Sequence, residues 1–293
     1  MDIQRGHGDQ KRQMTCLRMI LPGDTLAGIW LMTAFTANSD IMRQNDPQIF
    51  TFPDTEHLAR ILTVEVLNLV KDSMSTGRRF NIALSGGSTP RILFEHIAKF
   101  YKDPGIWDNV SFYWVDERCV PPNHPESNFR MANEIFLSNL SHPNEQIFRM
   151  KGEEDPHLEA NRYSRLIFNQ VHNADNLPAF NLIMLGLGGD GHTASIFPGQ
   201  LELLWTDNFC DVGVHPGTGQ KRITLTGKVI NNAENVFFLV SGREKAKMVV
   251  RIICEGSGKE ELPATFINPE HGNLSWFLDE AAASLLHNKE NPG

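Results

Sequence analysis

Short apolar runs alternate with longer amphipathic stretches along most of the chain. The runs are rich in aromatic and branched side chains and predict buried strands, whereas apolar positions that recur every three or four residues predict helices. We expect strands at 81–84, 110–115, 182–185, 222–225 and 236–240, and helices at 58–73, 92–100, 131–140, 158–171, 243–254 and 275–286. This alternation indicates an α/β fold with a doubly wound, mostly parallel sheet flanked by helices, of the Rossmann-like kind.

One large domain is enough to accommodate this pattern, and we expect it to span residues 49–293. Within it, segment 199–220 is rich in Gly, Pro and Asp and is predicted to be an irregular, variable loop. Residues 1–48 carry no motif, so we interpret them as a disordered extension or as the result of a translation start upstream of the native one, with Met42 as the internal candidate. A signal peptide is the alternative, because small residues follow the apolar run 26–35, which is too short to span a bilayer.

The most informative segment is 181–199, where an apolar strand runs into a glycine-rich loop that carries Asp190 and His192. Ligands bind beyond the carboxyl ends of parallel strands, and glycines let the backbone approach a ligand closely. The segment also matches a dinucleotide fingerprint at Gly186, Gly188 and Gly191. That motif requires a long helix directly after it, and the Pro-Gly pair at 198–199 stops any helix within about two turns. A tight turn with a solvated Asp and His is the remaining alternative.

A second strand followed by glycines lies at 80–90 and continues into an amphipathic helix. We expect Ser88 or Thr89 to cap this helix and Pro90 to occupy its first position. Gly86 and Gly87 would then expose backbone N–H groups toward an anion at the positive end of the helix. The segment therefore predicts a phosphate-binding loop, although an ordinary capped turn between a strand and a helix has the same pattern.

A third strand ends at three consecutive charges, Asp116, Glu117 and Arg118, which we expect to face the same rim of the sheet. Ser127 is the predicted cap of the helix that follows. Alternatively, the three charges form a solvated strand exit.

Together these segments resemble the 6-phosphogluconolactonase family, within the larger group that includes glucosamine-6-phosphate deaminases. The resemblance covers about residues 50–286 and lies in segments 85–90, 116–118, 127–128, 188–199, 222–226, 241–246 and 262–283. Deaminase relatives carry Asp-Glu-Tyr where this chain has residues 116–118, and Phe-Asn-Glu-Pro where it has Ser195-Ile-Phe-Pro198. The acidic residue of that second motif, which serves ring opening and proton transfer in a deaminase, is missing here.

The resemblance implies hydrolysis of 6-phosphoglucono-δ-lactone, the second step of the oxidative pentose phosphate route. His192 would be the general base, because imidazole ordinarily titrates at about pH 6.5 and can accept a proton from water. Asp190 would orient His192 or its loop, and Arg118 would hold the phosphate or stabilise the oxyanion at C1. The substrate-binding and phosphate-binding residues implied are Gly86, Gly87, Ser88, Thr89, Asp116, Arg222 and Lys245.

Three alternative functions are weighed against lactone hydrolysis. A deaminase-like isomerase would share the phosphate loop, and a non-catalytic sugar-phosphate sensor would keep the loop without the reaction. A serine hydrolase is disfavoured because Ser195 is not set in a Gly-x-Ser-x-Gly elbow.

The net charge and the cysteine content restrict the classes of partner and the cellular compartment that we expect. A net charge of −8 favours neither nucleic acid nor an anionic membrane, so the expected partner is a small sugar-phosphate lactone attracted by local cations. The four cysteines are far apart, without the spacing of a zinc site or a disulfide framework. We therefore expect a cytoplasmic enzyme with no metal and no cofactor. The sequence leaves the oligomeric state undetermined.

Overall fold

The computed structural model describes residues 47–101, 104–140, 144–174, 176–255 and 261–286. The interpretation of residues 1–48 as an extension falls almost entirely on residues 1–46, which, with the candidate start at Met42, lie outside the described residues. The proposed domain boundary at residue 49 falls inside the first described strand, β1 (Gln48–Phe52), to which Gln48 already belongs.

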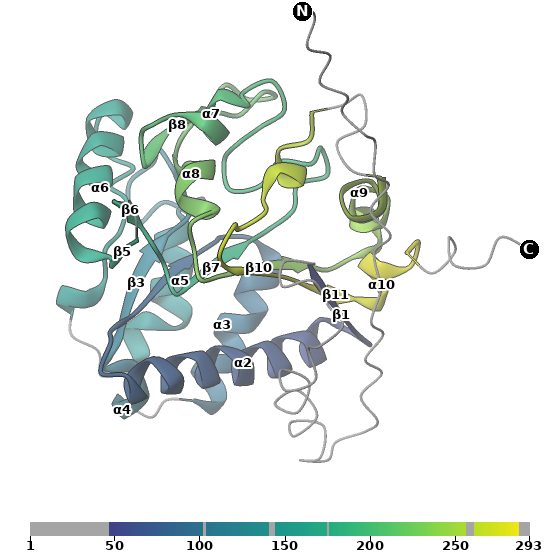
Figure 1. Cartoon of the computed structure of the whole chain (residues 1–293), viewed down its shortest axis with the longest axis horizontal. Coiled ribbons are helices and arrows are strands. Elements are labelled where there is room, and N and C mark those ends of the chain that lie inside the picture. Colours follow the sequence, from purple (N-terminus) through teal and green to yellow (C-terminus); the bar gives the residue numbers. More distant parts are fainter. Residues whose placement is uncertain (1–46, 102–103, 141–143, 175, 256–260, 287–293) are drawn as a thin grey trace, which may run out of the picture.

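The centre of the molecule is a six-stranded sheet with the order β1-β11-β10-β7-β2-β3 (Figure 1). Every pairing in it is parallel. Its further strands are β2 (Phe80–Leu84), β3 (Val110–Trp114), β7 (Leu182–Leu185), β10 (Asn235–Val240) and β11 (Asn273–Asp279). β3 lies on one side of β2, and β7, β10 and β11 lie on the other, so the strand order reverses between β2 and β7. The expected doubly wound parallel sheet is confirmed.

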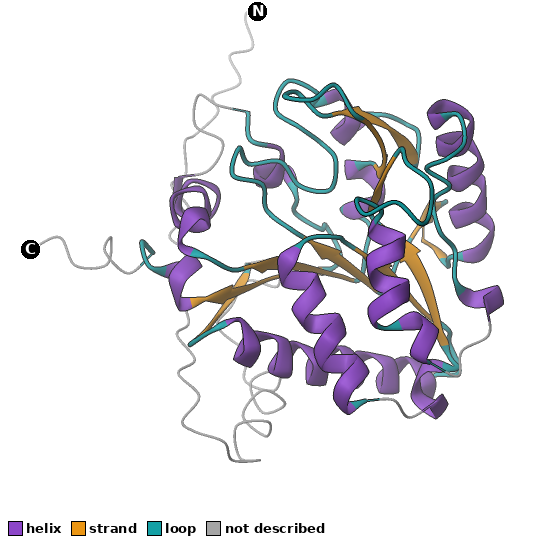
Figure 2. Cartoon of the chain, turned by 180° about the vertical axis from the view of Figure 1, so that it is seen from behind, coloured by secondary structure: helices purple, strands orange, loops and turns teal. Residues whose placement is uncertain are grey.

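Helices cover both faces of this sheet. Helices α2 (Thr55–Ser75), α3 (Ser88–Phe100) and α5 (Asn128–Ile135) lie along one face, as Figures 1 and 2 show. On the other side lie α8 (Gly227–Ile230) and α9 (Ala246–Val250), and α6 (Pro156–Gln170) packs against a smaller sheet. Strands β2, β3 and β7 are buried along their whole length, and β10 and β11 along most of theirs, because they are covered on both faces. The edge strand β1 buries only Ile49 and Phe52. No helix in the described part of the chain is long and apolar enough to cross a membrane.

The remaining elements are short. They are the helices α4 (Pro104–Trp107), α7 (Glu202–Trp205) and α10 (Glu280–Ala283), the two-residue strands β5 (Asn173–Ala174) and β6 (Leu177–Pro178), the 3₁₀ turns Leu137–Asn139, Asn144–Gln146, Arg243–Lys245 and Pro263–Phe266, and the π turn Arg251–Glu255.

A second sheet of three antiparallel strands stands beyond the carboxyl ends of the large one. It consists of β4 (Asp116–Arg118), β9 (Lys221–Leu225) and β8 (Cys210–Val214), in the order β4-β9-β8. Two expectations are corrected here. The strand expected at 222–225 exists but pairs antiparallel with β4 and β8, outside the parallel sheet. The segment 199–220, expected to be irregular, contains α7 and β8, because β9 offers β8 a complete set of backbone partners that its composition alone does not reveal.

The helix expected at 275–286 is wrong. Residues Asn273–Asp279 form β11, which pairs with β10 on one side and with β1 on the other, and only Glu280–Ala283 are helical. Trp276, Phe277 and Leu278 are all buried, so no polar face of a helix exists there. Consecutive buried apolar residues fit a strand covered on both faces, and a short apolar run by itself does not distinguish this from a buried helix.

Candidate active site

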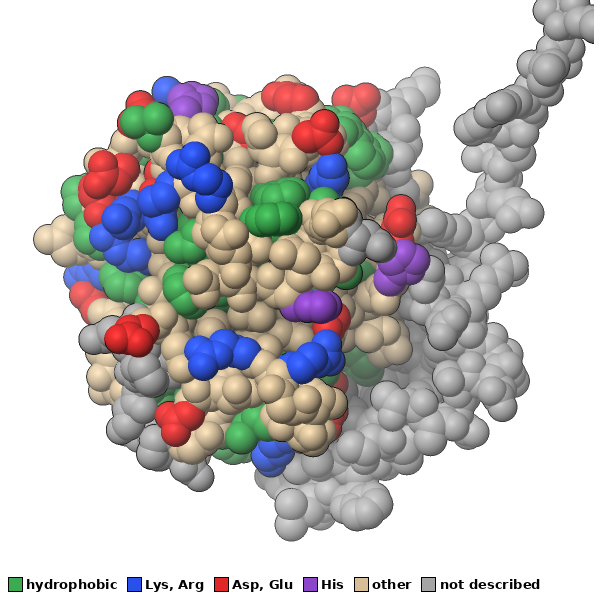
Figure 3. Space-filling model, turned by 60° about the vertical axis from the view of Figure 1, so that its left-hand side comes forward, with side chains coloured by type: hydrophobic (Ala, Val, Ile, Leu, Met, Phe, Trp, Pro, Cys, Tyr) green, Lys and Arg blue, Asp and Glu red, His purple; other side chains and the backbone are tan. Residues whose placement is uncertain are grey.

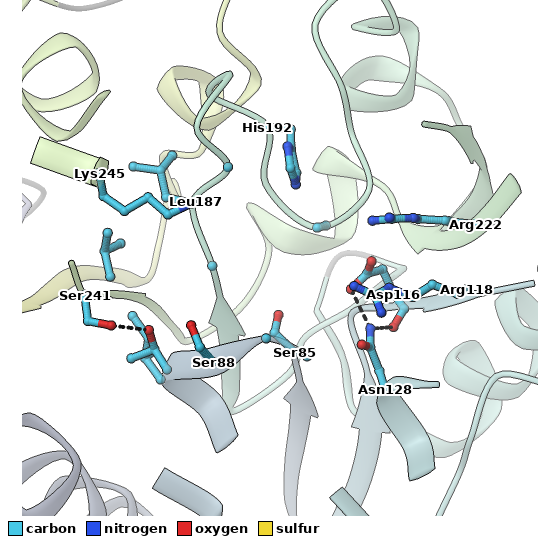
Figure 4. A pocket seen from close by; sticks show the side chains of 18 residues that line it. Ser85, Ser88, Asp116, Arg118, Asn128, Leu187, His192, Arg222, Ser241 and Lys245 are labelled. Carbon is cyan, nitrogen blue, oxygen red and sulfur yellow. Dashed lines mark hydrogen bonds between the residues drawn. The ribbon is translucent and has the colours of Figure 1, made fainter. Parts of the chain in front are cut away.

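A cavity of about 210 Å³ opens at the carboxyl ends of β2 and β7, where the strand order reverses (Figure 4). This is the position at which open α/β sheets bind their ligands. The cavity is lined by residues 85–89, Asp116, Arg118, Asn128, 186–188, His192, Ala194, Arg222, 239–241 and Lys245. It therefore gathers every site residue expected from the sequence except Asp190.

The loop after β2 forms one wall of the cavity. Gly87 has a φ of 106° and is itself the N-cap of α3, whose first residue is Ser88. The expectation that Ser88 or Thr89 caps the helix and that Pro90 opens it is therefore wrong. The left-handed turn at Gly87 starts the helix one residue earlier, and no side chain caps the first N–H groups. These groups of a 13-residue helix face the cavity as anion donors.

Glycine is required at position 86 because the backbone there lies very close to the Asn128 side chain. A Cβ atom there would collide with the Asn128 side chain, whose amide donates to the carbonyl oxygen of Asp116 at 2.9 Å. Glycine at this position lets the loop lie directly against α5 and β4.

Successive side chains of β4 point to opposite faces of the strand, and this separates its three charges. Asp116 and Arg118 line the cavity, whereas Glu117 points the other way, so the expectation that all three face one rim is corrected. The Glu117 carboxylate accepts the N–H groups of Asn128 and Phe129 and the hydroxyl of Ser127, and it thereby fixes the start of α5. Burial raises the pKa of Glu117, and these hydrogen bonds oppose that rise. Ser127 caps α5 as expected.

Asp116 is held by two donors. Ser195 Oγ donates to Asp116 Oδ2 at 2.5 Å, and the Asn128 amide donates to Oδ1 at 3.3 Å. Ser195 is fully buried, so its hydroxyl positions Asp116 and is not available as a nucleophile. This geometry agrees with the absence of a serine-hydrolase elbow.

The glycine-rich loop after β7 brings Asp190 and His192 together. His192 Nδ1 lies 2.6 Å from Asp190 Oδ1, and the hydrogen bond from His192 lowers the pKa of Asp190 to about 2. The ionised carboxylate can only accept, so Nδ1 must carry the proton and the neutral ring keeps its lone pair on Nε2. The His192 ring lines the cavity (Figure 4). Asp190 lines a neighbouring cavity instead.

The chain after this loop excludes the dinucleotide alternative. Thr193 and Ile196 form an isolated bridge, and the next helix is the four-residue α7. No long helix follows Gly191 to hold a pyrophosphate at its N-terminus.

Phe197 supports two of the polar side chains and was missed by the sequence analysis. Its fully buried ring lies 4.7 Å from the His192 ring, centre to centre, and Arg222 Cζ lies 5.6 Å from the Phe197 ring centre. Phe197 therefore sets the positions of a base and a cation from one apolar surface. Only its place two residues after Ser195 in the motif could have indicated this role.

Arg118 and Arg222 form a pair of like charges. They stand directly opposite each other on β4 and β9, and burial together with Arg118 lowers the pKa of Arg222. Arg118 Nη1 donates to the Glu126 carbonyl oxygen at 2.6 Å, and its buried Nε has no protein partner. Like charges at opposite positions are unfavourable in a sheet, so an anion between them would be strongly favoured.

Lys245 reaches the cavity from the other side, out of the turn that follows β10 (Figure 4). Beside it, Ser241 shares a 2.8 Å hydrogen bond with Thr89. The sequence analysis did not single out Ser241, although its place directly after a parallel strand is the signal that identified the other loops. Lys245 and Arg222 point toward each other across the cavity with His192 between them (Figure 4).

A family model and two similar curated proteins indicate the same family. The family model for glucosamine-6-phosphate isomerases and 6-phosphogluconolactonase matches residues 53–276. The chain is 39% identical to the 6-phosphogluconolactonase of Treponema pallidum over 197 residues, which are 67% of this chain and 82% of that protein. It is 38% identical to the 6-phosphogluconolactonase of Haemophilus influenzae over 207 residues, which are 70% and 87% of the two chains.

A solved structure of 6-phosphogluconolactonase from Trypanosoma brucei has the same fold. It superposes with a TM-score of 0.75 at 28% sequence identity. The match covers 83% of this chain and 100% of the Trypanosoma brucei chain. Residues 53–276, which the family model matches, include every residue that lines the cavity.

Proposed function

The chain belongs to the glucosamine-6-phosphate isomerase and 6-phosphogluconolactonase family, and on that premise we propose that it hydrolyses 6-phosphoglucono-δ-lactone to 6-phosphogluconate in the oxidative pentose phosphate pathway. The observation that carries this proposal is the Asp190–His192 pair, whose free Nε2 faces a cavity rich in anion donors.

His192 acts as the general base. Its Nε2 takes a proton from water, and the resulting hydroxide attacks the C1 carbonyl carbon of the lactone. The tetrahedral oxyanion then collapses, the bond between C1 and the ring oxygen breaks, and the protonated imidazole returns its proton to that oxygen. Asp190 holds the ring in the tautomer that this sequence needs and stabilises the imidazolium that forms.

The cations and the helix N-terminus bind the charged parts of the substrate. Backbone N–H groups of residues 86–89, together with Lys245 and Arg222, hold the phosphate. Arg118 holds the phosphate or the C1 oxyanion. Asp116 uses two of its acceptor sites on Ser195 and Asn128 and keeps others for a substrate hydroxyl.

Phe197 distinguishes this reaction from that of a deaminase. It stands where the deaminase motif has glutamate, and it is fully buried beneath His192 and Arg222. A phenyl ring cannot shuttle protons between C1 and C2, as an isomerisation requires, whereas lactone hydrolysis needs only one base. This contact favours the lactonase over a deaminase-like isomerase.

The substrate test compares the two reactions directly. We expect the protein to consume fresh 6-phosphoglucono-δ-lactone well above the spontaneous rate and to release no ammonia from glucosamine 6-phosphate. Ammonia release at an enzymatic rate, with the lactone decaying only spontaneously, would reverse the assignment. Binding of 6-phosphogluconate with neither reaction would instead identify a sugar-phosphate sensor.

The proposed function also implies a domain organisation, a binding partner and a cellular compartment. Residues 49–293 form the single catalytic domain, and its partner is a small sugar phosphate of the cytoplasm. Acidic and basic side chains lie interspersed over the face in Figure 3, and the net charge is −8, so neither a nucleic acid nor a membrane is proposed as a partner.

A further inference from the structure

Asp279 is a buried carboxylate outside the cavity with three donors around it. It ends β11, caps α10 through a 2.7 Å hydrogen bond from the Ala282 N–H, and accepts the Thr55 hydroxyl at 3.3 Å. Both of its oxygens also lie 3.1 Å from the Gly242 nitrogen. The chemistry described so far gives this residue no role.

Gly242 begins the turn that carries Lys245. Its φ is 97°, and its carbonyl oxygen accepts the Lys245 N–H at 3.1 Å. The preceding residue, Ser241, is tied to Thr89 at the start of α3. Lys245 belongs to a single 3₁₀ turn, Arg243–Lys245, which has little stability of its own. The position of this turn therefore depends on its anchors, which are Asp279 on one side and Thr89 on the other.

We propose that Asp279 is a positioning residue for phosphate binding. By fixing the N–H of Gly242, it holds the turn from Ser241 to Lys245 so that the Ser241 hydroxyl and the Lys245 ammonium face the cavity beside the N-terminus of α3. The identity of the anion as a phosphate rests on the proposed function. In this proposal, β11 and α10 contribute to substrate binding through Asp279.

The variant Asp279→Asn tests this role. The amide keeps the size of the carboxylate but carries no charge, and its NH₂ group replaces one of the two oxygens that the Gly242 N–H approaches. This N–H therefore keeps a single, uncharged acceptor. We expect KM for the lactone to rise about tenfold, as when a charge-assisted contact to phosphate is weakened, with kcat within about twofold of the wild type. The Kd for inorganic phosphate, measured by calorimetry, should rise by a similar factor.

Asp155→Asn is the matched control. Asp155 also caps a helix with its carboxylate, accepting the N–H groups of His157 and Leu158, and α6 lies on the opposite side of the molecule from α10 (Figure 1). This variant should lower Tm and leave KM and the phosphate Kd unchanged. Equal KM shifts in both variants, or a lower Tm with unchanged KM in Asp279→Asn, would overturn the positioning role.

Gly242→Ala keeps the test decisive if Asp279→Asn does not fold. A side chain at this φ is strained, and its Cβ would meet the Glu244 carboxylate, so the turn shifts while the cap of α10 stays intact. The same rise in KM and in the phosphate Kd is expected, and unchanged values would refute the proposal. Because phosphate titration needs no turnover, a protein that lacked lactonase activity would contradict the proposed function and leave this measurement valid.

Discussion

At the scale of single residues, the reaction depends on an imidazole whose protonation is set by its neighbour. Asp190 is ionised and hydrogen-bonded to Nδ1 of His192, which leaves Nε2 as the only basic atom of the loop that faces the cavity. Phe197 then sets the ring in place from beneath.

Replacing His192 by alanine removes the base without disturbing the loop. We expect kcat to fall by about 10²–10⁴-fold, the usual contribution of a general base, with Tm nearly unchanged because the side chain is partly exposed. Lactone consumption measured against the spontaneous rate checks this. A variant with near wild-type kcat would remove His192 from the mechanism.

Asp190→Asn tests the tautomer and its dependence on pH. The amide NH₂ can donate to Nδ1, which moves the ring proton to Nε2, so kcat should fall by about 10²–10⁴-fold. The folded-state pKa of Asp190 is about 2, below its ordinary value of 3.8, so the carboxylate stabilises the fold above about pH 4 and loses this effect as the pH falls toward 2. The Tm difference between wild type and variant should therefore be constant above pH 4 and vanish near pH 2. A difference that grew on acidification would contradict the pairing.

Arg222 and Lys245 approach the cavity from opposite sides, so their single variants separate their roles. We expect Arg222→Ala and Lys245→Ala each to raise KM by about tenfold or more, with a smaller effect on kcat, because both contact a phosphate remote from the reacting carbon. Steady-state kinetics with each variant decide this. A variant that lowers kcat at constant KM would place its cation at C1 instead.

At the scale of elements, the loop after β7 can hold Asp190 and His192 together because the backbone at Gly188 lies very close to both side chains. A Cβ on Gly188 would collide with His192 Nδ1 and Asp190 Oδ1, although the backbone conformation of Gly188 suits any residue. Glycine is therefore needed at this position for space and not for its φ freedom.

Gly188→Ala should separate the pair while the strand stays intact. A displacement of about 1 Å at a reacting group can cost about 10²-fold in rate, so we expect kcat to fall by roughly that factor with little change in Tm. Gly189→Ala is the matched control, since a Cβ there meets nothing within 4 Å. Equal losses of activity in the two variants would show that general loop stiffness matters and not the collision.

Local patterns predicted some elements well and others not at all. Strands β2, β3, β7 and β10 were recognised because their apolar runs end in glycines or charges. Strand β11 was taken for a helix and β8 for an irregular loop, because each depends on partners distant in the sequence. Residues 273–278 pair with 235–240, and residues 210–214 with 221–225.

At the scale of the whole molecule, the domain is closed at one edge by β1. This strand pairs with β11, and Ile49 and Phe52 are buried in the core. A chain that begins at Met42 keeps β1 and every motif, so we expect its Tm and activity to match the full chain in a side-by-side measurement.

A chain that begins at Pro53 is the contrasting truncation. It lacks both buried side chains of β1 and leaves β11 as an unprotected edge, which should cost about 3–6 kcal/mol of unfolding free energy. A stable and active protein without β1, or an unstable one that begins at Met42, would move the domain boundary.

The sequence by itself determined the chemistry that is available and the kind of fold that presents it. Glycines after strands, a carboxylate two residues before a histidine, and charges at a strand end are local features, and parallel strands bring their carboxyl ends to one edge. The tertiary structure alone decided which of these groups meet. Ser195 reaches Asp116, Arg222 stands opposite Arg118, Phe197 lies beneath both His192 and Arg222, and Asp279 holds Gly242. Most of these contacts join separate strands and loops, so they follow from strand pairing and core packing, which no local pattern specifies.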